Sequence, residues 1–218
     1  MVNIFEDALL TPSEVSAYLR IPRPTVYSWL AENDGGQPLV HRVTPERRGY
    51  ASVPFVALVE AYVLRALRNE LKFTKSRIRE AVADVRQTFD TPYALATKRI
   101  ATDGVDIFID HGAGDLARAG DHQRPIREMI EGYLRYITWS DDEFASRLTL
   151  KQFPESAEVV IDPRFGWGAP VLARNKTPVR AVVDLWAAGE SMPTVAEEYG
   201  LTVEEVEAIC RVGVKSAA

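Results

Sequence analysis

Residues 11–30 read TPSEVSAYLRIPRPTVYSWL, and this stretch decides how the first part of the chain folds. Thr11 and Glu14 have the T-x-x-E spacing of a capping box, which satisfies the free backbone N–H groups at a helix start. Pro22 and Pro24 cannot lie inside a helix, so the first helix must end before them. Pro24 can begin a second helix, because proline suits the first helical turn. We therefore predict two short helices across a tight turn, a helix-turn-helix.

The second of these helices has a polar side that is suited to contact DNA. Val26, Trp29 and Leu30 are spaced so that they face the core. The outward residues lie near the helix N-terminus, where a recognition helix touches base edges. They are Arg23, Thr25, Tyr27 and Ser28. We predict that these four residues bind double-stranded DNA; the alternative is a solvated helix in an interaction domain.

A basic turn follows the two helices. Residues 39–43 and 50–53 are predicted to be the strands of a hairpin whose tip is formed by residues 44–49. A basic hairpin in this position is typical of the wing of a winged helix-turn-helix domain, and its arginines can contact phosphates or enter the minor groove. The candidate residues are Arg42, Arg47, Arg48 and Tyr50. An ordinary polar turn is the alternative.

The charges of the two halves of the chain differ in sign. Residues 1–100 hold 14 Lys and Arg against 11 Asp and Glu, a net charge of +3. Residues 101–218 hold 12 against 20, a net charge of −8. DNA binding depends on a local basic face, so the first half can meet a phosphate backbone that the second half would repel.

Several classes of protein are excluded or disfavoured. The longest stretch without a charged residue, 49–59, has 11 residues, whereas a membrane helix needs about 20. Cys210 is the single cysteine, which excludes an intrachain disulfide and a CxxC zinc site, and we expect it to be a small buried hydrophobe. The chain has no basic-then-apolar signal peptide, so we expect a cytoplasmic protein without membrane contact.

An acidic stretch with two histidines gives no recognisable metal motif. Its candidate ligands are Asp106, Asp110, His111, Asp115, Asp121 and His122. Their spacing matches no metal site, and we predict a solvated acidic loop. The three histidines of the chain also have no nucleophile motif around them. We therefore expect no metal, no cofactor and no enzymatic activity.

Helices are predicted over residues 54–71 and 75–89. Their apolar stripes are long enough to form the interface of a homodimer, the usual assembly of helix-turn-helix proteins. The dipeptide Asp103-Gly104 between the segments 98–102 and 105–109 predicts a second hairpin. A polar loop over residues 110–124, a helix from Pro125 to about Tyr136 and short strands near 146–150 and 159–161 complete the middle of the chain.

The last part of the chain again predicts short helices. They cover residues 179–188 and 193–199, and a third begins after Thr202. The predicted fold is mainly α, in three parts: residues 1–90 form a winged helix-turn-helix DNA-binding domain with a helical extension, residues 91–157 a small α+β linker domain, and residues 158–218 a three-helix domain that is itself helix-turn-helix-like.

A running order of short motifs in this last part resembles a known family. The motifs are Val160-Ile161-Asp162-Pro163, Gly168-x-Pro170-Val171, Thr177-Pro178-Val179, Ala188-Gly189-Glu190-Ser191 and Tyr199-Gly200-Leu201-Thr202. They resemble the small helical domain of uncharacterised function that occurs in many short bacterial antitoxins. The family's usual Gly-Thr-Arg before the first helix is replaced by Arg174-Asn175-Lys176. The N-terminal part resembles MerR-like or excisionase-like domains, and the whole chain is similar to longer VapB-type antitoxins.

This resemblance implies a type II antitoxin. Such a protein would bind and neutralise a PIN-domain ribonuclease toxin of the VapC type, and would bind its own promoter as a repressor. Toxin binding would lie after residue 90, most of it in the C-terminal domain. The alternative is a stand-alone MerR-like transcription regulator whose segment 91–157 senses a ligand.

Candidate toxin-binding residues follow from the same resemblance. The nuclease site of such a toxin is acidic, and arginine pairs well with carboxylates. Aromatic side chains are also favoured at interfaces. The candidates are Arg174, Lys176, Arg180, Trp186 and Arg211. The cations and Trp186 are alternative carriers of the affinity, because charges at an interface rim often contribute little.

Overall fold

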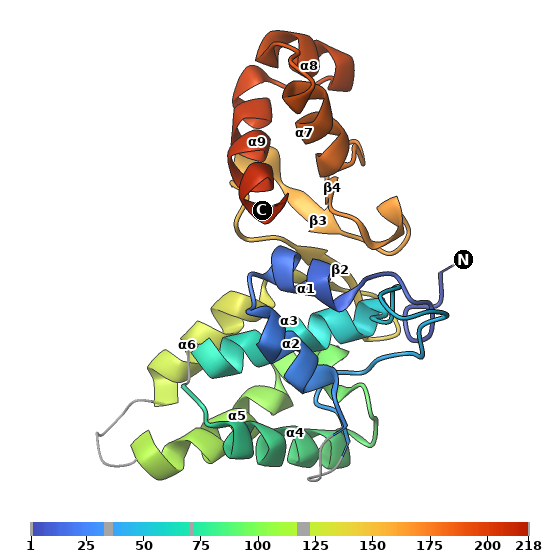
Figure 1. Ribbon diagram of the computed structural model, residues 1–218. Helices are drawn as coiled ribbons and strands as arrows, with labels where there is room; N and C mark the ends of the chain where they lie inside the picture. Colours follow the sequence, from blue (N-terminus) through green and yellow to red (C-terminus); the bar gives the residue numbers. More distant parts are fainter. Residues whose placement is uncertain (1, 33–36, 70–71, 117–122, 218) are drawn as a thin grey trace.

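The structure is a computed structural model that describes residues 2–32, 37–69, 72–116 and 123–217. Figure 1 shows α1 (Pro12–Leu19) between the other helices of the N-terminal part and a C-terminal group. The elements of this group are β3 (Val159–Ile161), β4 (Val171–Leu172), α7 (Val179–Ala187), α8 (Met192–Tyr199) and α9 (Val203–Ala217). The side-chain amide of Gln152 donates to the Tyr18 carbonyl of α1 at 3.0 Å, and α9 also contacts α1. The helix-turn-helix is therefore packed against the C-terminal part.

The predicted helix-turn-helix is confirmed as α1 (Pro12–Leu19) and α2 (Arg23–Leu30). The Thr11 hydroxyl accepts the Glu14 N–H at 3.2 Å, and the Glu14 carboxylate accepts the Thr11 N–H at 2.7 Å. Arg20 takes a left-handed conformation, with φ at 51°, and ends α1. The three apolar residues of α2 predicted to face the core are all buried.

The centre of the N-terminal part is α3 (Phe55–Asn69), whose side chains are buried around almost its whole circumference. A helix that is apolar on every side must be covered on every side. Its neighbours are α1, α4 (Lys75–Phe89), η1 (Ala94–Ala96), α6 (Gln123–Leu134) and β2 (Ala145–Thr149). The apolar stripe of α4 is also buried within the chain. The interpretation of these stripes as a dimer interface is therefore wrong.

The predicted wing is not a hairpin. Over residues 39–53 the structure contains no strand, and only one backbone bond, from the Val43 N–H to the Ser52 carbonyl at 2.9 Å, crosses between the predicted strands. Two backbone N–H groups of the predicted strands donate elsewhere. The His41 N–H donates to a carboxylate of α3, and the Ser52 N–H donates to the carbonyl of Leu10. The segment is a loop fixed by the core, with a turn at residues 47–50.

The second predicted hairpin is also wrong. Lys98–Ala101 forms the short helix η2, and Asp103–Leu116 forms α5. Val105, Phe108 and Ile109, all buried, have helical spacing as well, and acidic residues in the first turn suit the helix dipole. A Cβ at position 104 would lie 2.7 Å from the Ile100 side chain, so this glycine lets the two helices approach.

The remaining middle elements agree with the sequence more closely. The predicted polar loop is helical from residue 110 to 116, and residues 117–122 lie outside the described part. α6 corresponds to the helix predicted from Pro125. The strands β1 (Ile137–Trp139), β2 (Ala145–Thr149), β3 (Val159–Ile161) and β4 (Val171–Leu172) form an antiparallel sheet in sequential order. β2 and β3 match the two predicted strands, whereas β1 and β4 were missed.

The three C-terminal helices are confirmed as α7 (Val179–Ala187), α8 (Met192–Tyr199) and α9 (Val203–Ala217). Ser191 caps α8, and Gly200 ends it with φ at 60°. Cys210 is buried among the apolar side chains of these helices, and burial raises the pKa of its thiol. In the described ranges no helix has the length and apolar character needed to cross a membrane.

Candidate functional site

The outer side of α2 carries the predicted recognition residues. Arg23 is exposed, the Tyr27 side chain is 53% exposed and Ser28 is half-buried. The first turn of α2 contains no acidic residue. The N–H groups of Thr25 and Val26 already donate to the Pro22 carbonyl, so the exposed Arg23 guanidinium is the group at this helix start that can attract a phosphate.

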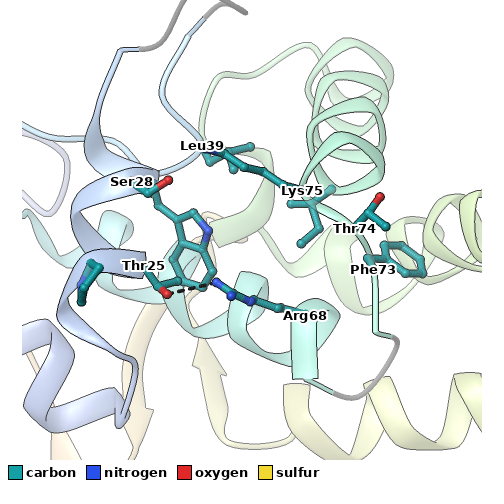
Figure 2. A pocket seen from close by; sticks show the side chains of 10 residues that line it. Thr25, Ser28, Leu39, Arg68, Phe73, Thr74 and Lys75 are labelled. Carbon is teal, nitrogen blue, oxygen red and sulfur yellow. Dashed lines mark hydrogen bonds between the residues drawn. The ribbon is translucent and has the colours of Figure 1, made fainter.

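Thr25 has a second role in the structure. The guanidinium of Arg68, at the end of α3, donates to the Thr25 hydroxyl at 3.0 Å. Thr25 and Ser28 line a hollow of about 450 Å³ between α2 and the connection from α3 to α4 (Figure 2). The charged residues that line it are Arg68 and Lys75, and no lining residue is acidic.

Arg68 and Lys75 were missed by the sequence reasoning. Arg68 lies 43 positions after Thr25, Lys75 lies further along the chain, and only the packing of α3 and α4 brings them to α2. Their positions at the end of one predicted helix and the start of the next were the signal in the sequence. They enlarge the basic surface beside the predicted recognition residues.

The loop over residues 39–53 holds the other predicted DNA contacts. Arg42, Arg47 and Arg48 are exposed, and the Tyr50 side chain is 51% exposed. Within the described ranges, none of the three guanidiniums is paired with a carboxylate. Charges without an internal partner are available to phosphates.

A buried charge network holds the start of this loop. Glu60 of α3 is completely buried, and its Oε1 lies 2.8 Å from His41 Nδ1 and 3.8 Å from the Arg86 guanidinium. Arg86 donates to the carbonyls of Pro38 and Leu39 at 3.0 and 3.1 Å. Burial lowers the pKa of Arg86, and the charge of Glu60 opposes that shift. The network fixes the chain that leads from α2 to the arginine-bearing turn.

The predicted toxin-binding cations are distributed over the C-terminal part, and three of them form ion pairs. Arg174 donates to Glu205 at 2.9 Å, Arg180 to Asp184 at 3.1 Å, and Arg211 to Glu207. Lys176 donates to the Ala173 carbonyl, and its Nζ lies 5.3 Å from the centre of the Phe165 ring.

Trp186, the predicted aromatic contact of the C-terminal part, is less exposed than that prediction implies. Trp186 is only partly exposed and packs against the core. Trp167 was missed, although its side chain is 67% exposed. The signal was available in the sequence, because Trp167 stands between two glycines outside any predicted helix.

The acidic stretch does not gather metal ligands in the described part of the chain. Asp106 is paired with Arg127, and His111 Nε2 lies 2.7 Å from an Asp84 oxygen. Asp121 and His122 lie outside the described residues.

Comparisons with known proteins match both ends of the chain. Residues 8–82 match a family described as "Putative DNA-binding HTH domain", and residues 159–211 match one described as "Protein of unknown function (DUF433)". The chain is 33% identical to "Putative antitoxin VapB45" of Mycobacterium tuberculosis H37Rv over 223 residues, which covers 93% of this chain and 92% of the relative. The crystal structure of Rv2018 from M. tuberculosis matches with a TM-score of 0.78 and 30% identity, over 95% of this chain and 99% of that one.

Proposed function

The chain belongs to the VapB-type antitoxins, and from this premise we propose that it neutralises a PIN-domain ribonuclease toxin of the VapC type and represses its own promoter. DNA binding would use the N-terminal part, and toxin binding the C-terminal part. One observation supports this division of the two binding functions. The arginines before residue 50 are unpaired within the described residues, whereas the surface after residue 160 carries paired arginines and exposed aromatic side chains.

The proposed DNA interface consists of α2 and the loop after it. Arg23, Tyr27 and Ser28 would enter the major groove, and the loop arginines would bind the backbone or the minor groove. Thr25 would position Arg68 beside them. The proposed assembly is a homodimer, because one short recognition helix reads only a few base pairs. Its interface must use surfaces other than the buried stripes of α3 and α4.

The test of DNA binding uses the full chain and a fragment of its own promoter. We expect specific binding that weakens steeply with salt, because phosphate contacts release counterions. An unrelated fragment of equal length is the control. Equal affinity for both fragments would contradict autorepression.

The test of toxin binding uses co-expression with the product of the adjacent reading frame. We expect the two proteins to co-purify, and the ribonuclease activity of the partner to be suppressed in the complex. A partner that neither binds nor is inhibited would contradict the antitoxin role of this chain.

The stand-alone regulator remains the second candidate because of a hollow of about 550 Å³ beside β2. Its lining includes Arg135, Tyr136, Lys151, Phe153 and Glu158, a mixture of charged and aromatic side chains that suits a small polar ligand. A ligand bound there that changes promoter affinity in the absence of any toxin would favour this function.

A further inference from the structure

The loop between β3 and β4 presents two aromatic side chains to solvent. Trp167 is 67% exposed and Phe165 is 39% exposed, and Trp167 is the most exposed large hydrophobic residue in the described part of the chain. A tryptophan in this position has a large contact area and only two side-chain torsions to immobilise. Tryptophan is also enriched among the residues that dominate binding energy at interfaces.

The backbone under Trp167 is held in an unfavourable conformation. Gly166, Trp167 and Gly168 have φ values of 66°, 50° and 86°, all in the left-handed region. Glycine adopts this region freely, whereas a bulky residue does so only where its surroundings impose it. Such imposed conformations cluster at functional sites. Arg20 and Lys176 share this region, so at Trp167 the left-handed backbone sets the point from which the indole leaves the chain.

Close packing on both sides of Trp167 leaves no room for a side chain at Gly166 or Gly168. A Cβ at Gly166 would lie 2.8 Å from Val171 Cγ1 of β4. A Cβ at Gly168 would lie 2.9 Å from the Cβ of Leu9, just before α1. The loop is thus fixed to its own sheet on one side and to the N-terminal part on the other.

A buried carboxylate anchors the base of the loop. Asp162 is fully buried and accepts three hydrogen bonds from Arg164: from the backbone N–H at 3.0 Å, from Nε at 2.9 Å and from Nη2 at 2.7 Å. The Phe165 N–H donates to the Asp162 carbonyl at 2.9 Å. An aromatic pair on such a rigid base loses little entropy when it binds a partner.

A single cation beside the two aromatic side chains forms no ion pair in the described part of the chain. Residues 163–183 contain four Lys and Arg and no Asp or Glu, but Arg164, Arg174 and Arg180 are paired with Asp162, Glu205 and Asp184, which leaves Lys176. The cations of Lys176 and Arg164 lie 5.3 and 5.7 Å from the centre of the Phe165 ring. The complementary surface is an apolar cleft with carboxylates at its rim.

We propose that Trp167, supported by Phe165, is the anchor by which this antitoxin binds its toxin, inserted into an apolar cleft with an acidic rim. The inference rests on the proposed function and names the surface that carries it out. The proposed aromatic contact is therefore Trp167 and not Trp186, which was predicted from the sequence but packs against the core.

The decisive variant is Trp167→Gly in the full chain. Glycine adopts a φ of 50° without steric cost, so the loop can keep its conformation while the indole is lost. We expect affinity for the adjacent-frame toxin, measured by biolayer interferometry, to fall at least about thirty-fold. Trp167→Phe should recover part of this loss. Val203→Ala, which truncates another exposed hydrophobe of the same part, is the matched control and should bind normally.

The other outcomes overturn the proposal in different ways. If wild-type chain binds the toxin and Trp167→Gly binds equally well, the loop is not the anchor, and the antitoxin function stands. If the wild-type chain does not bind the toxin, both inferences fail. If Trp167→Gly turns a dimer into a monomer in light scattering, or weakens promoter binding as much as toxin binding, then a second copy or DNA occupies this loop instead.

Discussion

The two basic regions of this antitoxin use their cations differently. In the N-terminal loop Arg42, Arg47 and Arg48 are exposed and, within the described residues, unpaired. In the C-terminal part Arg174 and Arg180 are each bound to a carboxylate of the same chain. An unpaired surface cation is available to a phosphate, whereas a paired one must exchange one carboxylate for another and gains little. We therefore propose that the first region recognises its partner mainly through charge, and the second mainly through shape and aromatic contact.

The manner in which each region is fixed also differs. The N-terminal loop begins at the buried network of Glu60, His41 and Arg86. The C-terminal loop is held by Asp162 and by close backbone packing at two glycines. Variants of these groups test the comparison, because each should damage one region and spare the other.

The largest effect is expected from Glu60→Ala. It leaves the buried Arg86 without its counter-charge and releases the His41 N–H, so the free energy of unfolding should fall by about 3 kcal/mol. Urea unfolding measures the change. Glu46→Ala, which removes an exposed carboxylate of the same loop, is the control and should change stability by less than about 0.5 kcal/mol. Similar small losses in both variants would show that the network does not hold the loop.

The sequence predicts the helices better than the connections between them. The capping box at Thr11 and the prolines at 22 and 24 are local signals, and local signals were sufficient for α1, α2 and the three C-terminal helices. The two hairpins failed because alternating apolar residues fit more than one structure. Long-range partners decided the outcome: a carboxylate of α3 took the His41 N–H, and Ile100 packed against Gly104.

In the candidate sites, too, local signals predict individual exposed residues but not their long-range partners. Individual outward residues of α2, such as Tyr27, could be predicted from helical spacing, because spacing fixes the exposed face. The position of Arg68 beside Thr25 could not, since it depends on how α3 crosses α2. The pairing of Arg174 with Glu205 depends likewise on the packing of α9, 31 residues later.

The second effect concerns DNA. Arg47→Ala combined with Arg48→Ala should weaken binding to all sequences by roughly ten- to thirty-fold and reduce the slope of log affinity against log salt by about 2, because two phosphate contacts are lost. Fluorescence anisotropy over a salt series measures both. Toxin affinity should be unchanged, and Arg180→Ala, which removes an exposed arginine of the C-terminal part, is the control that should leave DNA affinity unchanged. An unchanged salt slope would place the DNA contacts elsewhere.

The third effect is a dependence of stability on pH in the C-terminal loop. Burial opposes the ionisation of Asp162, but its hydrogen bonds and charge interaction with Arg164 outweigh burial and hold the pKa of this carboxyl below its usual range. A lowered pKa in the folded state adds stability above about pH 4, which is lost as the pH falls through the folded pKa. Asp162→Asn should therefore cost about 2 kcal/mol at pH 7 and progressively less below pH 4.

Urea unfolding of wild type and Asp162→Asn at several pH values measures this difference. Asp141→Asn is the control, because its side chain is exposed and, in the part of the chain that the structure describes, forms no ion pair. A wild-type advantage that stays constant down to pH 2 would contradict the assignment.

The smallest effects should come from the paired cations of the C-terminal part. Arg180→Ala removes an exposed i,i+4 pair and should change the free energy of unfolding by less than about 0.5 kcal/mol. Arg174→Ala should cost about 1 kcal/mol, because its guanidinium also bonds the Gly200 carbonyl at the end of α8. Each should weaken toxin binding less than about ten-fold, since a rim charge that already has an internal partner contributes little. If either variant lost as much toxin affinity as Trp167→Gly, charge would dominate the second region too, and the contrast between the two regions would not hold.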